Sequence, residues 1–288
     1  MAILLDGKKL AQKLKSEISQ KSAEMKASGF TPTLAVILCG DDPASAVYVR
    51  NKRKDCEECG FESLEYKLPA DYGEDQLLKL VESLNRDPKV HGILVQLPLP
   101  DGYDETRIIH AISPEKDVDA FHPFNVGKIM IGEPGFLPCT PAGVMLLLEE
   151  YGIEPKGKEC LVIGRSNIVG KPMAILLLRK NGTVTIAHSK TQNLANKCRE
   201  ADILVAAVGK ANLITDDMIK PGAVIIDVGM NRDENGKLCG DVDFEGCEKV
   251  ASYITPVPGG VGPMTRAVLM KNTLQAAEEA KEILRNNF

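Results

Sequence analysis

The chain has 288 residues, 44% of them hydrophobic, and a formal net charge of −5. This length fits two domains or one large domain, and the negative charge argues against a dedicated nucleic-acid-binding protein. No stretch approaches the roughly 18 apolar residues of a membrane span, and the start lacks a basic region. We therefore expect no signal peptide, no membrane association and a cytoplasmic location.

Eight cysteines are scattered along the sequence, and only Cys56 and Cys59 lie close together. A zinc site would need a second pair or histidines nearby. Helical spacing places both thiols on one helix face, where they behave as small apolar side chains. We predict structural thiols in a reducing compartment, and no metal site.

The first half of the sequence alternates between helix and strand patterns. The predicted helices span 6–28, 44–59, 74–85 and 106–111, and the predicted strands span 34–39, 61–68 and 92–96. This alternation indicates a parallel sheet with both faces covered. Ligands bind outside the carboxyl ends of such strands, so Cys39–Pro43 and Gln96–Pro100 are candidate walls of one cleft.

The pattern weakens from 121 to 140, where glycine and proline accumulate, as in a connection between domains. A helix from Pro141 to Tyr151 follows, with Thr140 as its cap. A second alternating series then predicts strands at 159–163, 183–187, 203–207 and 223–228, which is the doubly wound arrangement found around dinucleotides. The closing helix, from Pro263 to about Leu284, has an apolar stripe suited to packing back on the first domain.

We therefore predict an α/β protein of two domains. The first is a three-layer-like α/β catalytic domain over residues 1–139 plus 264–288. The second is a Rossmann-type doubly wound domain over residues 140–263.

The strand at 159–163 runs into Gly164, Arg165 and Ser166, and a helix is predicted to begin near Ile168. Backbone N–H groups and the helix dipole converge at such a turn and suit a phosphate. The spacing is Gly-x-Ser-x-x-x-Gly and not Gly-x-Gly-x-x-Gly, so an ordinary tight turn is the alternative.

The end of the next strand bears on the choice of cofactor. Enzymes that select NAD usually carry an acid there, to hold the ribose 2′-hydroxyl. Here the strand ends in His188-Ser189-Lys190-Thr191, with no acid. Together with Arg165, this favours NADP over NAD.

Tyr48 and Lys52 lie four residues apart on a predicted helix and therefore share a face. A lysine near a phenol in a partly desolvated cleft is suited to proton transfer, and Arg50, Arg53 and Lys54 would add positive charge nearby. The alternative is a solvated basic helix face.

Asp117 and Asp119 alternate on an extended segment and so point in opposite directions. One can bind a ligand while the other caps the following turn. A carboxylate suits a ligand edge that presents two N–H donors, although turn chemistry alone would also explain both residues.

Taken together, these stretches resemble one family, the bifunctional methylenetetrahydrofolate dehydrogenase/methenyltetrahydrofolate cyclohydrolases. The resemblance runs from the first helix to the last. It is carried by Tyr48-Val49-x-x-Lys52, Gln96-Leu97-Pro98-Leu99-Pro100, Lys116-Asp117-Val118-Asp119, Cys139-Thr140-Pro141, Gly164-Arg165-Ser166-x-Ile168-Val169-Gly170-x-Pro172, His188-Ser189 and Thr255-Pro256-Val257-Pro258-Gly259-Gly260-Val261-Gly262-Pro263.

The resemblance implies a two-step reaction of one-carbon metabolism, linked to purine biosynthesis. Methylenetetrahydrofolate gives a hydride to NADP, and the methenyl product is hydrolysed to formyltetrahydrofolate. Lys52 would transfer protons, Gln96 would tune Lys52, Tyr48 would stack on the folate, and Asp119 would bind the pterin. The other implied folate contacts are Leu97, Pro258, Gly259, Gly260 and Gly262.

On the cofactor side, the resemblance implies that Gly164, Arg165, Ser166 and Ser189 bind the phosphates and that Met230 contacts the nicotinamide. Met230 stands where the family usually has isoleucine, and Ala120 where glycine is common. The family also implies a homodimer. Two alternatives stay open: an NADP oxidoreductase of the shikimate dehydrogenase type, and a non-catalytic NADP-binding regulator.

Overall fold

The computed structural model describes residues 1–286, and its contacts divide the chain into two compact units. The six-stranded unit comprises residues 1–11, 129–133 and 138–265. The three-stranded unit comprises residues 12–128, 134–137 and the chain from Arg266 on. The last two residues of the predicted range 264–288 lie outside the described residues.

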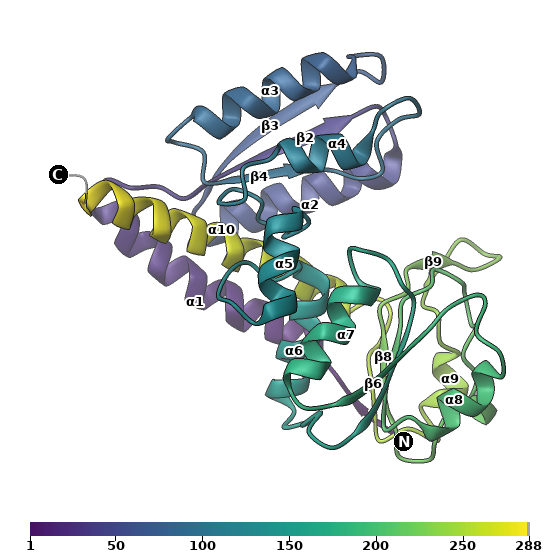
Figure 1. The fold of residues 1–288 in the computed structure, drawn as a ribbon. Coiled ribbons are helices and arrows are strands. Elements are labelled where there is room, and N and C mark those ends of the chain that lie inside the picture. Colours follow the sequence, from purple (N-terminus) through teal and green to yellow (C-terminus); the bar gives the residue numbers. More distant parts are fainter. Residues whose placement is uncertain (287–288) are drawn as a thin grey trace. The chain divides into compact units, whose positions relative to one another are not determined.

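The three-stranded unit has a parallel sheet in the order β3-β2-β4. Alternate side chains of the central strand pack against helices α3 and α4 in one apolar core, and α2 contacts the strands from the other face (Figure 1). The strands are β2 (Thr33–Cys39), β3 (Glu62–Leu68) and β4 (Gly92–Val95). The helices are α1 (Gly7–Ala27), α2 (Pro43–Cys59), α3 (Glu74–Arg86), α4 (Glu105–Ala111), α5 (Pro123–Ile131) and α10 (Val261–Asn286), some of which extend beyond this unit.

Helices α1 and α10 lie side by side in this unit (Figure 1), and Lys281 Nζ donates to Ser28 Oγ at 2.6 Å. Buried Asp55 on α2 joins both, because its carboxylate binds Lys15 of α1 at 3.0 Å and Arg266 of α10 at 2.7 Å. The predicted return of the closing helix to the first domain is confirmed in this packing.

The six-stranded unit has a parallel sheet in the order β1-β11-β8-β7-β5-β6. Its strands are β1 (Ile3–Leu4), β5 (Glu159–Ile163), β6 (Thr183–Ala187), β7 (Ile203–Ala206), β8 (Val224–Asp227) and β11 (Tyr253–Ile254). Its other elements are α6 (Cys139–Glu150), α7 (Gly170–Arg179), α8 (Leu194–Glu200), the 3₁₀ turn η1 (Asp216–Met218), α9 (Phe244–Cys247) and the hairpin β9 (Asn231–Arg232) with β10 (Leu238–Cys239).

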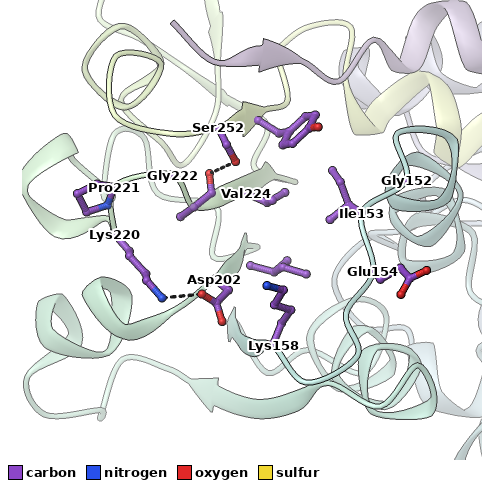
Figure 2. A pocket seen from close by; sticks show the side chains of 13 residues that line it. Gly152, Ile153, Glu154, Lys158, Asp202, Lys220, Pro221, Gly222, Val224 and Ser252 are labelled. Carbon is purple, nitrogen blue, oxygen red and sulfur yellow. Dashed lines mark hydrogen bonds and ion pairs between the residues drawn. The ribbon is translucent and has the colours of Figure 1, made fainter.

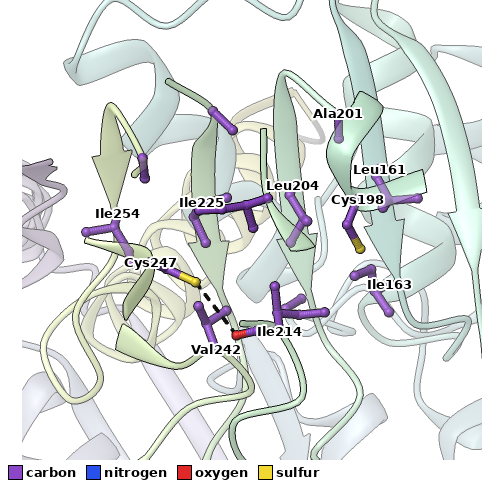
Figure 3. Close-up of a cluster of buried hydrophobic side chains, with 14 of the residues drawn as sticks. Leu161, Ile163, Cys198, Ala201, Leu204, Ile214, Ile225, Val242, Cys247 and Ile254 are labelled. Carbon is purple, nitrogen blue, oxygen red and sulfur yellow. Dashed lines mark hydrogen bonds between the residues drawn. The ribbon is translucent and has the colours of Figure 1, made fainter. Parts of the chain in front are cut away.

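One face of this sheet is covered by a buried apolar cluster (Figure 3). Leu161, Leu204 and Ile225 contribute from the central strands, and Cys198 and Cys247 from the covering helices α8 and α9. The strands that supply this core are all parallel, so their carboxyl ends meet at one edge, where a doubly wound sheet binds its ligand.

Three local expectations were wrong, and one strand was not predicted. Helix α6 begins at Cys139 with Pro138 as its cap, and Thr140 contacts the Thr265 hydroxyl at 2.9 Å. The helix expected near Ile168 begins at Gly170. Region 121–140 contains α5, although it was expected to be a connection. The start of the chain forms β1 beside β11, a two-residue pairing too short to leave a sequence pattern.

Within residues 1–286, none of the helices is long and apolar enough to span a membrane.

Candidate active and cofactor sites

The carboxyl edge of the three-stranded sheet brings Lys52 and Gln96 together. Lys52 Nζ donates to Gln96 Oε1 at 2.9 Å, and Gln96 Nε2 donates to the Leu97 carbonyl at 2.7 Å. A carboxamide has one acceptor oxygen and one donor nitrogen. Because the nitrogen is committed to Leu97, the oxygen is fixed toward the lysine, and both side chains are half-buried.

Three basic residues close to Lys52 in the sequence line a cavity of their own. Arg50, Arg53 and Lys54 border a space of about 350 Å³ between α2 and the edge strand β3, and Arg53 pairs there with Glu57 at 3.1 Å. Their expected contribution to the charge around Lys52 stays a prediction. Tyr48 lies one turn before Lys52 and is also half-buried.

Asp117 and Asp119 differ in burial. Asp117 is buried and accepts from the His122 amide at 2.8 Å, the Phe121 amide at 3.2 Å and Asn125 Nδ2 at 2.8 Å. Burial raises the pKa of Asp117, although these donors oppose the shift. Asp117 is therefore the structural member of the pair, and half-buried Asp119 is the candidate ligand contact.

The segment that carries both aspartates is joined to the sheet at one point, because Ile93 of β4 forms an isolated parallel bridge with Asp117. The chain turns directly after this bridge, and the Ala120 amide donates to the Asp117 carbonyl at 3.0 Å. The expectation that Asp117 and Asp119 alternate on an extended segment was therefore wrong. Both aspartates belong to the three-stranded unit, as do Lys52 and Gln96.

The loop after β5 requires two glycines. Gly164 has φ +134°, and a Cβ there would lie 2.3 Å from the Ala207 carbonyl oxygen; a Cβ on Gly170 would lie 2.3 Å from the Gly164 oxygen. The loop therefore folds back closely against its own helix, as a phosphate-binding turn does.

Ser166 closes this turn. Its Oγ accepts from the amides of Val169 at 3.1 Å and Gly170 at 3.2 Å. A hydroxyl has two lone pairs and one proton, so these bonds leave its O–H as a donor. Within the described residues, the amides of Arg165 and Ser166 donate to no protein acceptor, and the exposed Arg165 side chain makes no ion pair. These donors fit a phosphate group.

The other predicted cofactor contacts lie at carboxyl ends of the same sheet. Ser189 is exposed in the turn after β6, where His188 Nδ1 accepts from the Lys190 amide at 3.2 Å. Met230 follows β8 and is 50% exposed.

The segment after β11 contains the other predicted folate contacts. Pro258 and Gly262 are exposed and Gly259 is half-buried, whereas Gly260 is buried. Gly7 packs on Gly260, since a Cβ on Gly7 would lie 1.8 Å from the Gly260 oxygen. A Cβ on Gly260 itself would lie 2.7 Å from the Pro256 oxygen and 2.8 Å from the Thr255 Cβ, so Gly260 also has a structural reason to lack a side chain.

A different cavity, of about 330 Å³, opens at the opposite, amino edge of the six-stranded sheet (Figure 2). Asp202 and Lys220 pair there at 2.6 Å, and Asp202 also accepts from the Glu159 amide. None of the predicted site residues lines this cavity.

The eight cysteines are all free thiols, and seven are buried. Burial raises the pKa of Cys56 and of Cys59 to about 12, so these thiols stay protonated and unreactive at neutral pH.

Comparison with known proteins identifies the family. A profile for the tetrahydrofolate dehydrogenase/cyclohydrolase catalytic domain matches residues 5–119, and one for the NAD(P)-binding domain of the same enzymes matches residues 138–281. The chain belongs to this family. It is therefore a tetrahydrofolate dehydrogenase/cyclohydrolase with an NAD(P)-binding domain, and the predicted family, two-domain α/β fold and enzyme class are confirmed.

Individual relatives of this tetrahydrofolate dehydrogenase/cyclohydrolase match over nearly its whole length. The bifunctional protein FolD of Acetivibrio thermocellus is 60% identical over 277 residues, covering 96% of this chain and 97% of that protein. The crystal structure of FolD from Campylobacter jejuni has a TM-score of 0.96 at 52% identity and covers 97% and 99% of the two chains.

Two further solved structures are relevant, one to the choice of cofactor and one to the alternative of a shikimate-type dehydrogenase. FolD from Trypanosoma brucei, complexed with NADP cofactor and inhibitor, has a TM-score of 0.93 at 40% identity, covering 97% of this chain and 98% of that one. A shikimate 5-dehydrogenase from Thermus thermophilus has a TM-score of 0.53 at 17% identity, covering 86% of this chain and 99% of that one. The latter likeness extends to the fold alone.

Sequence reasoning missed two buried aspartates at the carboxyl edge of the six-stranded sheet, Asp227 and Asp241. Asp227 ends the apolar strand β8, and an acid in that position was a usable signal. Asp241 follows Gly240 in an irregular segment and left no pattern.

Proposed function

We propose that this chain oxidises 5,10-methylenetetrahydrofolate with NADP and hydrolyses the resulting 5,10-methenyltetrahydrofolate to 10-formyltetrahydrofolate. The observation that carries the proposal is the Lys52–Gln96 hydrogen bond at the carboxyl edge of the three-stranded sheet. An ammonium or amine held by a fixed acceptor suits proton transfer to and from a bound substrate.

The hydrolytic step needs a proton to be moved. Water adds to the cationic methenyl carbon and loses one proton, which gives a neutral hydroxyl adduct. The bond from that carbon to one ring nitrogen then breaks while the hydroxyl oxygen loses its second proton and becomes the formyl C=O. One of the two protons goes to the released nitrogen and the other to solvent. Lys52 would take the proton from the water-derived oxygen and deliver it to the leaving nitrogen. Gln96 would hold Lys52 in place, because its own carboxamide is fixed by the Leu97 carbonyl.

The remaining folate contacts follow from their chemistry. Asp119 would accept two N–H bonds from the amino-pyrimidine edge of the pterin. Tyr48 would stack on the folate rings, and Leu97 would add an apolar contact. Pro258, Gly259, Gly260 and Gly262 would add contacts through the backbone.

NADP, when bound, accepts the hydride of the first step. Gly164, Arg165, Ser166 and Ser189 would hold its phosphates, supported by the unpartnered amides and the free O–H of the turn. Arg165 would favour the 2′-phosphate, because a guanidinium binds phosphate with paired donors. Met230 would contact the nicotinamide.

One assay tests this function against its rival. The purified protein is given methylenetetrahydrofolate or shikimate, each with NADP or NAD, and the reduced cofactor is followed by absorbance. We expect turnover only with the folate, and faster turnover with NADP. Turnover of shikimate, or of neither substrate, would contradict the proposal.

Asp119→Ala tests the pterin contact. We expect its folate KM to rise at least tenfold, in line with about 1.5–3 kcal/mol for hydrogen bonds to a charged group. An unchanged KM would place Asp119 outside the pocket.

We further propose that the protein acts in the cytoplasm as a homodimer, as its family resemblance implies. Light scattering coupled to size-exclusion chromatography tests the dimer, and a mass of one chain at micromolar concentration would contradict it.

A further inference from the structure

Two buried carboxylates connect the loops at the carboxyl edge of the six-stranded sheet. Asp241 is 0% exposed and Asp227 is 4% exposed. Within the described residues, neither forms an ion pair with a lysine, arginine or histidine, so their charge is balanced by hydrogen-bond donors alone. A buried charge without a cation is costly unless its lone pairs are satisfied.

Asp241 collects four donors from two loops. Its Oδ2 accepts from the amides of Val208 at 2.7 Å and Gly209 at 3.1 Å, in the loop after β7. Its Oδ1 accepts from the Lys210 amide at 2.8 Å and from Asn231 Nδ2 at 2.9 Å. One side chain therefore ties the loop after β7 to the segment after β8.

Asp227 fixes the other side of the same segment. Its Oδ1 accepts from the amides of Gly229 and Asp241, each at 2.9 Å, and its Oδ2 accepts from the Val242 amide at 2.9 Å. The Asp227 amide donates to Thr255 Oγ1 at 2.7 Å. The two carboxylates are thus linked through the Asp241 backbone.

Two glycines make this arrangement possible. A Cβ on Gly229 would lie 2.3 Å from Asp241 Oδ1, and a Cβ on Gly240 would lie 1.8 Å from Asp227 Oδ2. The Asp241 carboxylate therefore occupies the space that a side chain at Gly229 would take, and the Asp227 carboxylate occupies the space that a side chain at Gly240 would take. Such reciprocal packing fixes the backbone and not only the side chains.

Met230 stands between the two anchored residues, since Gly229 is bound by Asp227 and Asn231 by Asp241. We propose that Asp227 and Asp241 are positioning residues for the cofactor, which hold Met230 and the Val208–Lys210 loop in the geometry that binds the nicotinamide half of NADP. This inference rests on the proposed function only in assigning the nicotinamide contact to Met230.

Asp241→Asn tests the inference, because the amide keeps the shape but replaces one acceptor oxygen with a donor that faces backbone N–H groups. We expect NADP to bind at least tenfold more weakly and the KM for NADP in the dehydrogenase reaction to rise similarly. Hydrolysis of methenyltetrahydrofolate uses no hydride acceptor, so it should stay within twofold of wild type. A merely structural defect would lower both activities.

Asp202→Asn is the matched control. It removes an ion pair at the opposite edge of the same sheet (Figure 2), so it should lower the melting temperature without changing NADP affinity. Unchanged NADP affinity in Asp241→Asn, or an equal loss in Asp202→Asn, would overturn the inference.

If Asp241→Asn does not fold, the NADP affinity of Asn231→Ala tests the inference instead. This change removes one hydrogen-bond donor to Asp241 without altering a buried charge. NADP binding weakened at least threefold supports the inference, and unchanged binding overturns it. A wild-type protein without dehydrogenase activity that still binds NADP would contradict the proposed function, yet the binding comparison would still test the positioning role.

Discussion

At the scale of single residues, the proposed preference for NADP over NAD depends on the exposed side chain of Arg165. Arg165→Ala should weaken NADP by about ten- to hundredfold, the equivalent of roughly 1.5–3 kcal/mol for bonds to a charged group, and NAD by less than about twofold. Lys171→Ala is the matched control, because Lys171 is a cation in the first turn of α7 and its Nζ donates to Asn167 Oδ1 of the same loop at 2.6 Å. Binding titrations with both cofactors measure the effect, and equal losses for NADP and NAD would refute the 2′-phosphate assignment.

Ala120 adopts φ +59° and is fully buried, directly after Asp119. The left-handed conformation costs an L-residue roughly 1–2 kcal/mol, whereas losing one buried methyl costs about 0.8 kcal/mol and a glycine adds about 0.4–1 kcal/mol of unfolded-state entropy. These effects nearly cancel, so Ala120→Gly should change the unfolding free energy by less than about 1 kcal/mol.

Ala277→Gly serves as the control, because Ala277 is equally buried but helical. It should destabilise by more than about 1 kcal/mol, since it loses the methyl group and helix propensity with no relief of strain. Urea unfolding compares the two variants. A loss at Ala120 as large as that at Ala277 would show that the turn is unstrained.

The hydrogen-bond partner of a side chain could be predicted from the sequence where a family motif implies it. It could not be predicted where a side chain bonds the backbone of its own loop or of a neighbouring loop. The Lys52–Gln96 pairing was implied by the resemblance, and the structure contains it. Nothing in the sequence indicated that Ser166 would cap its own turn or that Asp241 would collect amides from two loops. Both depend on where the chain folds back, which residue spacing does not encode.

At the scale of elements, His91, directly before β4, forms a hydrogen bond with the first residue of β2. It is 4% exposed, its Nδ1 accepts from the Thr33 amide at 3.1 Å, and burial together with the Lys116 charge lowers its pKa to about 4. The folded state thus binds a proton less readily than the unfolded state, whose histidine pKa is near 6.5. The stabilisation that neutral His91 gives the folded state is complete above about pH 6.5 and is lost as the pH falls toward 4.

We therefore expect the unfolding free energy to fall by roughly 3 kcal/mol between about pH 7 and pH 4 because of this residue. His91→Asn keeps an acceptor for the Thr33 amide but does not titrate, so its stability should depend less on pH. Urea unfolding at several pH values measures both proteins. Parallel pH curves would show that His91 does not contribute.

Elements were predictable where burial imposes a pattern. Strands β2, β4 and β5 are apolar runs, and their predicted limits agree with the structure to within one residue. Helix α5 was missed because it contains Gly127 and starts at Pro123, which suggested a connection. The two-residue strands β1 and β11 depend on their partners across the sheet. Such pairing is a tertiary event without local periodicity.

At the scale of the whole molecule, the residues proposed for hydrolysis and those proposed for cofactor binding belong to two different units. Lys52, Gln96 and Asp119 belong to the three-stranded unit, whereas the Gly164–Gly170 loop and the Asp227–Asp241 pair belong to the six-stranded unit. We therefore expect variants at Lys52 to leave cofactor binding unchanged and variants at Asp241 to leave hydrolysis unchanged.

The most direct test of the account is the hydrolysis of methenyltetrahydrofolate by Lys52→Met, followed as the decay of the methenyl absorbance. General acid–base catalysis contributes about 10²–10⁴-fold, so the rate should fall at least about 100-fold while NADP affinity and melting temperature stay at wild-type values. Lys54→Met, an exposed change two residues along the same helix, should hydrolyse normally. Hydrolysis by Lys52→Met at the wild-type rate would contradict the central claim that Lys52 transfers the proton.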